Sequence, residues 1–134
     1  MRNSNNTSEI FTSPESFAFE QWPVYKASLE LCAISFSFRI ASSEIGHKSL
    51  IDQFKRASAS IPLNLSEGYS RFTKRDKLSF LRIAKGSTFE CVSILNILRQ
   101  IKRIDESTYR KIYELLRNVA RMLSGMINHL NKGN

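Results

Sequence analysis

The sequence is poor in the residues from which enzyme sites are most often built, and each scarcity removes a class of function. Its five glycines are scattered, so no glycine-rich loop can cradle a phosphate, and no GxSxG elbow occurs. The two cysteines, Cys32 and Cys91, lack CxxC spacing and have no histidine at a recognisable motif spacing. We therefore expect two buried free thiols and no catalysis.

Histidine is also scarce, which limits metal binding. Glu44 and His47 have the Glu-x-x-His spacing of di-iron bundles, but those bundles use two such pairs and two further glutamates. The other histidine, His129, has no glutamate three residues before it. The sequence therefore predicts no metal centre and no cofactor.

Long hydrophobic runs are absent as well. No stretch is apolar over enough residues to cross a bilayer, and the first residues lack the charged start and apolar core of a secretory signal. We expect a cytoplasmic protein. Its length of 134 residues, 42% of them hydrophobic, predicts one folded domain around a single core.

Acidic residues are outnumbered by basic ones. The 12 Asp and Glu residues face 20 Lys and Arg residues, which gives a formal net charge of +8. Such an excess favours a polyanionic partner, either nucleic acid or an anionic membrane surface. The membrane is the weaker interpretation, because each apolar helix face has a partner inside the expected bundle.

Two regions of the chain differ in composition. Residues 1–19 are rich in Asn, Ser and Thr and predict a flexible N-terminal arm, whereas residues 20–134 show helical periodicity. The four expected helices span residues 23–46, about 47–69, about 74–104 and about 105–130, and Gly46 is expected to end the first. Short connections between long helices predict an all-α, up-down-up-down antiparallel four-helix bundle.

The third expected helix has an apolar arc wider than one bundle core needs. Its first seam, at alternating spacings of three and four, is Leu81, Ala84, Thr88, Cys91, Leu95 and Leu98. Its second seam is Phe80, Ile83, Ser87, Glu90, Ile94, Ile97, Ile101 and Ile104. The surplus predicts contact with another subunit, and charged residues at positions 94 and 97 are expected to break up that contact.

Basic residues concentrate on the third helix and just before it. The expected nucleic-acid-binding residues are Arg71, Lys74, Arg75, Arg82, Lys85, Arg99 and Arg103. Cations along one face neutralise successive phosphates, and Phe89 among them offers a ring on which an unpaired base can stack. The alternative is a solvated polar face, which is what most charged helix faces are.

Polar residues on the second and third helices predict a structural network. Its expected members are Ser60, Asn64, Glu67, Ser87 and Glu90, and Glu67 is expected to pair with Arg71. Gly86 and Ala84 are expected to let the two helices approach closely. Because polar groups on a packed face must be paired, a network that fixes helix register is favoured over a catalytic site.

Two motifs on the same helices carry a family resemblance. The stretch from Ser60 to Tyr69, SIPLNLSEGY, is followed by Arg71, and FLRIAKGS from Phe80 to Ser87 is followed by Glu90. Both resemble signatures of the protein family encoded in the intervening sequences of bacterial 23S ribosomal RNA genes. Val24 to Ala27, Glu30-Leu31, Gln53 and Arg56-Ala57 also fit the family pattern, and the resemblance covers about residues 19–130.

This resemblance implies a four-helix bundle that assembles into a homopentameric ring and has no known enzymatic reaction. The chain is also similar to the accessory variability determinant (Avd) proteins of diversity-generating retroelements, which bind nucleic acid and a reverse transcriptase. Our primary hypothesis is a non-catalytic ring that binds RNA or DNA through the basic face, largely independently of sequence. The alternative is a protein-interaction scaffold for a reverse transcriptase or another nucleic-acid enzyme.

Overall fold

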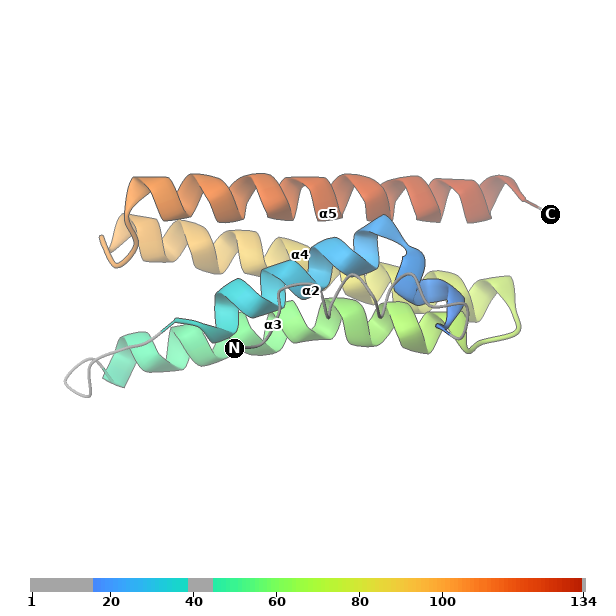
Figure 1. Cartoon of the computed structure of the whole chain (residues 1–134), viewed down its shortest axis with the longest axis horizontal. Coiled ribbons are helices and arrows are strands. Elements are labelled where there is room, and N and C mark those ends of the chain that lie inside the picture. The colour runs from blue at the N-terminus through green and yellow to red at the C-terminus, as the bar shows by residue number, and fades with distance from the viewer. Residues whose placement is uncertain (1–15, 39–44, 134) are drawn as a thin grey trace.

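The computed structural model describes residues 16–38 and 45–133, which form helices joined by turns (Figure 1). The elements are a short 3-10 helix, η1 (Ala18–Gln21), and the α-helices α2 (Pro23–Phe36), α3 (Ile45–Tyr69), α4 (Lys74–Gln100) and α5 (Glu106–Lys132). Consecutive helices run in alternating directions, and α2 also packs against α5, which closes the bundle. The predicted all-α four-helix bundle is confirmed. Of the described helices, none combines the length and apolar character needed to cross a membrane.

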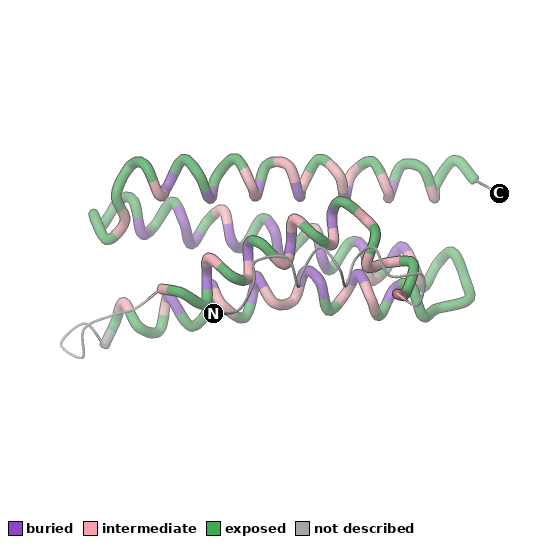
Figure 2. The backbone as a smooth tube through the Cα atoms, viewed as in Figure 1, coloured by how far each residue is buried: buried purple, intermediate pink, exposed green. Residues whose placement is uncertain are grey.

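The core lies along the inner faces of all four long helices (Figure 2). Every residue of the first seam of α4 is buried, as the spacing predicted. Across from it, α3 contributes Phe54, Ile61 and Leu65, and α5 contributes residues from Tyr109 to Ile127 at helical spacing. Apolar burial on this scale is the main source of stability in such a bundle.

The second seam of α4 divides between the core and the surface. Ile94 is only 3% exposed and belongs to the core, whereas Ile97 is 46% exposed and Ile83 and Ile101 also reach solvent. Treating Ile94 and Ile97 as one outward-facing pair was therefore wrong. The surplus apolar surface of α4 is narrower than the sequence indicated.

The first long helix ends ten residues before the predicted limit. Helix α2 stops at Phe36, and Gly46 lies in the first turn of α3, so the prediction that Gly46 ends the first helix is wrong. Ser37 ends α2: its backbone N–H and its hydroxyl both donate to the Ile34 carbonyl, which tightens the last turn. The stretch 39–44 lies outside the described residues.

Helix α4 also ends early, at Gln100 rather than at Ile104. Lys102 adopts a positive φ of 59°, and its N–H donates to the Arg99 carbonyl. The Arg103 N–H reaches back to the Leu98 carbonyl at 2.9 Å. This pair of bonds is a Schellman motif, which terminates the helix although lysine occupies the position where glycine is usual.

Pro62 lies inside α3 and has no N–H to give to the Ser58 carbonyl one turn earlier. The Cys32 thiol of α2 donates to that carbonyl instead, with Sγ 3.3 Å from the oxygen. Beside it, the buried hydroxyls of Ser35 and Ser58 are hydrogen-bonded at 2.7 Å. The contact between α2 and α3 thus satisfies the group that the proline leaves open.

Aromatic residues fix the start of the bundle. Phe19, in η1, packs edge-on against Trp22 and Tyr25, and Trp22 packs against Tyr69 at the end of α3. Residues 16–19, which the sequence assigned to the arm, are therefore partly joined to the bundle. The rest of the predicted arm, residues 1–15, lies outside the described part of the chain.

Asp105 caps α5, and the loss of Tm that follows its replacement should depend on pH. Its carboxylate accepts hydrogen bonds from the Thr108 N–H at 2.7 Å and the Thr108 hydroxyl at 2.9 Å, and these bonds lower the pKa of Asp105. A lowered folded-state pKa stabilises the protein above the unfolded-state value, and the contribution disappears as the pH falls through the folded-state value. Asp105→Ala should therefore lower Tm by a few degrees at pH 7, with a smaller difference in acid.

The check is thermal unfolding followed by circular dichroism between pH 2 and pH 7. Ser107→Ala is the matched control, because it alters an exposed neighbour that carries no charge. A Tm difference for Asp105→Ala that is constant over this range would contradict the capping role of the carboxylate.

Candidate nucleic-acid interface

Three of the seven predicted cations lie along one side of α4, where Arg75 and Arg82 are exposed and Lys85 is half-buried. Arg75 and Arg82 are seven residues apart, two turns of helix, and Lys85 follows three residues later. Arg75 and Arg82 form no ion pair with any acidic side chain in the described ranges. The Lys85 ammonium lies 5.7 Å from the centre of the Phe89 ring. We call Arg75, Arg82 and Lys85 the α4 basic row.

Two further predicted cations lie at the turn between α3 and α4. Arg71 Nη2 is 2.5 Å from Glu67 Oε1, and the Arg71 guanidinium stacks 4.8 Å from the centre of the Phe80 ring. Lys74 Nζ donates to the Gly133 carbonyl and, at 3.4 Å, to that of Asn131. Arg71 is thus paired with a carboxylate, whereas the partners of Lys74 are neutral carbonyls and carry no charge that would offset that of its ammonium group.

The last two predicted cations lie at the far end of α4. Arg99 forms two hydrogen bonds to Glu106, at 2.7 and 3.1 Å, and its guanidinium lies 4.4 Å from the centre of the Tyr109 ring. The bond to Glu106 raises the pKa of Arg99. Arg103 follows the end of the helix in the Schellman motif. Arg99 therefore fastens α4 to the start of α5 and is set apart from the α4 basic row.

The predicted polar network is present as three separate units. The Ser87 hydroxyl donates to the Ser60 hydroxyl at 2.8 Å, and the Asn64 amide donates to the same oxygen at 2.9 Å. Glu67 pairs with Arg71 on the surface, and Glu90 accepts a hydrogen bond from Gln53 at 3.1 Å. Of these bonds, Ser87 to Ser60 and Gln53 to Glu90 join α3 to α4, and all four of these residues line a cavity of about 280 Å³.

The close approach between α3 and α4 occurs at a different glycine from the one predicted. A Cβ at Gly86 would meet no other atom within 4 Å, so the expectation for Gly86 was wrong. A Cβ at Gly68 would lie 3.1 Å from Phe80 Cβ, which is tighter than ordinary packing. Gly68 is therefore the glycine that lets the two helices meet.

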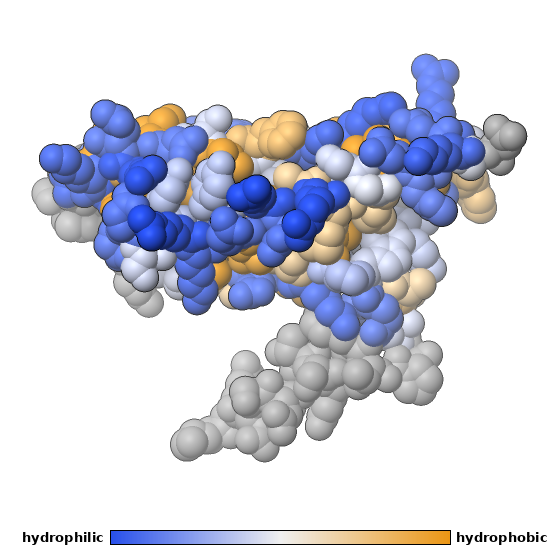
Figure 3. Space-filling view, turned by 90° about the horizontal axis from the view of Figure 1, so that it is seen from above, coloured by the Kyte–Doolittle hydropathy of each residue, from blue (hydrophilic) through white to orange (hydrophobic). Residues whose placement is uncertain are grey.

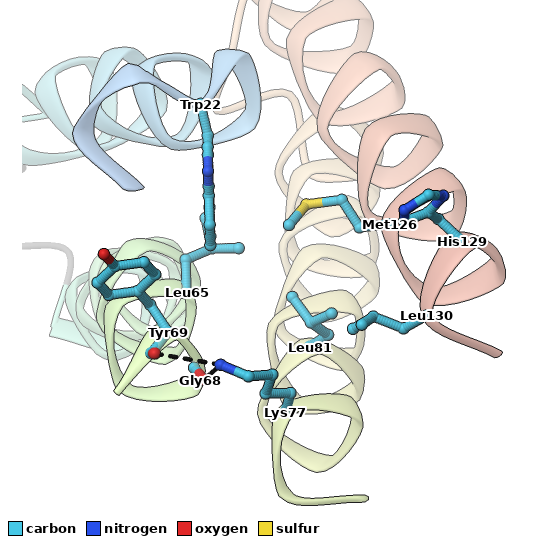
Figure 4. Close-up of a pocket in the computed structure, with 9 residues that line it drawn as sticks. All are labelled: Trp22, Leu65, Gly68, Tyr69, Lys77, Leu81, Met126, His129 and Leu130. Carbon is cyan, nitrogen blue, oxygen red and sulfur yellow. Dashed lines mark hydrogen bonds between the residues drawn. The ribbon is translucent and has the colours of Figure 1, made fainter. Parts of the chain in front are cut away.

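A second cavity, of about 260 Å³, opens beside Gly68, at the end of the bundle where α3 ends (Figure 4). It is lined by Trp22, Leu65, Gly68, Tyr69, Lys77, Leu81, Met126, His129 and Leu130. Lys77 Nζ donates to the carbonyls of Gly68 and Tyr69, at 3.4 and 3.2 Å, and so satisfies the end of α3. No carboxylate lines the cavity, so its walls carry no carboxylate–base pair for proton transfer.

The thiols and the metal-ligating side chains do not form a reactive cluster in the described residues. Burial raises the pKa of the Cys91 thiol to about 12, and it also raises that of Cys32. Both are free thiols and are neutral at physiological pH. In residues 16–38 and 45–133, no three His, Cys, Asp or Glu side chains gather closely enough to hold a metal ion. Glu44, of the Glu-x-x-His pair, lies outside these ranges.

The model of the family described as 23S rRNA-intervening sequence protein matches residues 20–125. The chain belongs to this family. A solved structure with a similar fold is a protein of unknown function from the S23 ribosomal protein family from Bacteroides thetaiotaomicron VPI-5482. It is 22% identical, the TM-score is 0.72, and the match covers 78% of this chain and 97% of that one. At this identity the likeness shows the fold alone. A comparison with curated proteins gives no match.

In this member of the intervening-sequence family, the two signature motifs lie against each other. The first occupies the end of α3 and the turn after it, and the second lies in α4. Ser60 meets Ser87, and Gly68 meets Phe80, so each contact joins one motif to the other. The motifs therefore hold α3 and α4 in register and orient the helix that carries the α4 basic row.

Sequence reasoning overlooked two features of the surface. The outer side of α5 carries Lys111, Arg117 and Arg121, and the side of the molecule seen in Figure 3 is largely hydrophilic. These residues fall opposite the buried stripe of α5, a spacing that would have revealed them. Phe72 is 99% exposed in the turn before α4, and its position among basic residues was the available signal.

Proposed function

We propose that this protein is a non-catalytic bundle that binds RNA or DNA through the α4 basic row, mainly by contacts to phosphates. The observation that carries the proposal is that Arg75 and Arg82 are exposed, that Lys85 lies half-buried beside them, and that none of the three has a carboxylate partner among the described residues. Helix α4 holds six basic and two acidic residues, within a chain of net charge +8. Such a row attracts a polyanion and reads little of its base sequence. This partner agrees with the cytoplasmic location that we propose.

We further infer that the bundle works as an oligomer, and specifically as the homopentameric ring that the family resemblance implies. The support within this chain is the apolar row Ile83, Ile97 and Ile101, which reaches solvent along α4 and at its C-cap in a single subunit. Exposed isoleucines at helical spacing suit a subunit contact. In a ring, each copy contributes one basic row, so the potentials of the rows add.

A second candidate function uses the same surface to bind an acidic protein. The row of exposed isoleucines beside the cations favours it, because protein interfaces combine an apolar centre with charged surroundings. A reverse transcriptase or another nucleic-acid enzyme is the partner that we infer from the similarity to Avd proteins.

The test of nucleic-acid binding is the salt dependence of affinity. The purified protein should bind mixed-sequence RNA with an affinity that falls steeply as salt rises, since phosphate contacts release counterions. The triple variant Arg75→Gln, Arg82→Gln, Lys85→Gln should bind more weakly. On single strands, the slope of log K against log salt should become shallower by about two.

A matched control removes the same number of charges from another helix. Lys111→Gln, Arg117→Gln and Arg121→Gln together lower the net charge equally but leave α4 intact. This variant should retain most of the salt slope. Equal losses in the two triple variants would show that net charge alone, rather than the α4 basic row, governs binding. A shallow salt dependence of the unmodified protein would exclude the proposed function.

A further inference from the structure

The turn between α3 and α4 presents a phenylalanine ring fully to solvent. Phe72 is 99% exposed, whereas the backbone on both sides of it is held in place. The Arg71 N–H donates to the Gly68 carbonyl at 3.2 Å, and Thr73 caps α4 by accepting from the Asp76 N–H at 3.1 Å. A large apolar ring on a fixed turn, in contact with nothing, contributes nothing to the packing of the bundle.

The surroundings of this ring are strongly basic. Lys74 and Arg75 follow it, and Lys77 lies one turn into α4. Lys74 and Lys77 donate to backbone carbonyls, which do not neutralise their charge, and Arg75 has no carboxylate partner among the described residues. Asp76 lies among these cations, but with Lys74, Arg75 and Lys77 around it the region keeps a net positive charge. Phe72 is therefore an apolar platform in a region where basic residues outnumber acidic ones.

We propose that Phe72 stacks on an unpaired base of single-stranded nucleic acid, while Lys74 and Arg75 bind the adjoining phosphates. The inference rests on the proposed function and narrows it to strands with accessible bases. Aromatic rings bind single strands in this way because every base has a free π-face, whereas the bases of a duplex are already stacked. A base on an exposed ring also keeps its polar edges in water, which the apolar cavity of Figure 4 would deny it.

The α4 basic row continues the path that begins at Phe72. Arg75 and Arg82 follow on the helix, and Phe89 stands beside Lys85 with about half of its surface exposed. Lys74, at the start of α4, and Phe89 are fifteen helical steps apart, which is about 22 Å at the helical rise. Two aromatic rings separated by cations thus give a strand of several nucleotides alternate stacking and phosphate contacts.

The experiment compares a labelled oligouridine of about 16 nucleotides with a blunt RNA duplex of the same length at about 50 mM salt. Phe72→Ala should weaken single-strand binding about tenfold and change duplex binding less than twofold. Phe72→Trp should restore single-strand binding, because indole stacks at least as well. Since the ring touches nothing, both variants should keep the Tm of the parent.

Phe36→Ala is the matched control, because Phe36 is also largely exposed but lies at the end of α2, over Lys55. It should leave both affinities unchanged. An equal loss on strand and duplex, or no loss on the strand, would overturn the role of Phe72 and leave the proposed function in place. Absence of binding to either RNA by the parent would overturn both. Phe72-dependent binding to phosphatidylserine vesicles, with unchanged RNA affinity, would make the ring a membrane contact instead.

Discussion

Phe54→Ala is expected to lower the free energy of unfolding by about 3–5 kcal/mol, the largest loss among the single substitutions considered. Phe54 is completely buried in α3, and its ring stacks on that of Phe38 with centroids 5.8 Å apart. Alanine would remove the ring from the centre of the bundle and leave a cavity that the surrounding helices can fill only partly. Since domains of this size have about 5–15 kcal/mol to lose, much of the stability would disappear.

Urea unfolding followed by circular dichroism measures this loss at a fixed protein concentration, because the stability of an oligomer depends on concentration. Leu63→Ala is the control: Leu63 belongs to the same helix but is 65% exposed, so the change should stay within about 0.5 kcal/mol. A loss of less than about 1 kcal/mol for Phe54→Ala would contradict the central position of Phe54 in the core.

The helices that the sequence predicted best are those whose starts carry a side-chain cap. Thr73 and Asp105 accept hydrogen bonds from the first turns of α4 and α5, and both helices begin where expected. The first seam of α4 was also recovered, because a 3.6-residue period places every third or fourth residue on one face. Most of the fold could therefore be predicted from local sequence patterns, namely the capping residues and the helical period.

Helix ends were harder to predict, because they depend on backbone states that composition does not reveal. Lys102 takes the left-handed conformation that glycine or asparagine more often occupies. At Ser37, a hydroxyl bonds to a carbonyl and the helix stops although the apolar period continues. At Pro62 the opposite occurs, because the helix continues through a residue that usually breaks it. The carbonyl that Pro62 leaves without a donor is bonded by Cys32 of α2, and a contact between two helices cannot be predicted from the local sequence.

The sequence could predict where the cations of the candidate site lie, but not which side chains they pair with. Spacing placed Arg75, Arg82 and Arg99 on α4, but it could not show that Glu106, seven residues after Arg99, would fold back across a turn to bind it. Periodicity likewise could not separate Ile94 from Ile97. The two residues differ by less than one turn, and only the packing of α3 and α5 decides which of them is covered.

That distinction determines how the proposed ring should be tested. A charge at Ile94 would enter the core and unfold the subunit, so its effect on assembly would have no clear meaning. Ile83 and Ile97 are both about half exposed and lie on the same side of α4. Ile83→Lys combined with Ile97→Lys should therefore leave the fold intact while placing two desolvated charges in each subunit contact.

We expect this double variant to lose the oligomer and run as a subunit of 15.4 kDa in light scattering after gel filtration. Each isoleucine contributes about 1.5–3 kcal/mol when buried, and each lysine would add the cost of an unpaired charge, so a contact repeated around a ring cannot persist.

Phe36→Lys, which places a lysine on α2 instead, should keep the parental mass. A parent that is already monomeric would exclude the ring, and an intact oligomer in the double variant would place the subunit contact elsewhere. Loss of the oligomer would also show whether single-strand affinity depends on several basic rows acting together, because one isolated row would bind more weakly while its Phe72 dependence remained.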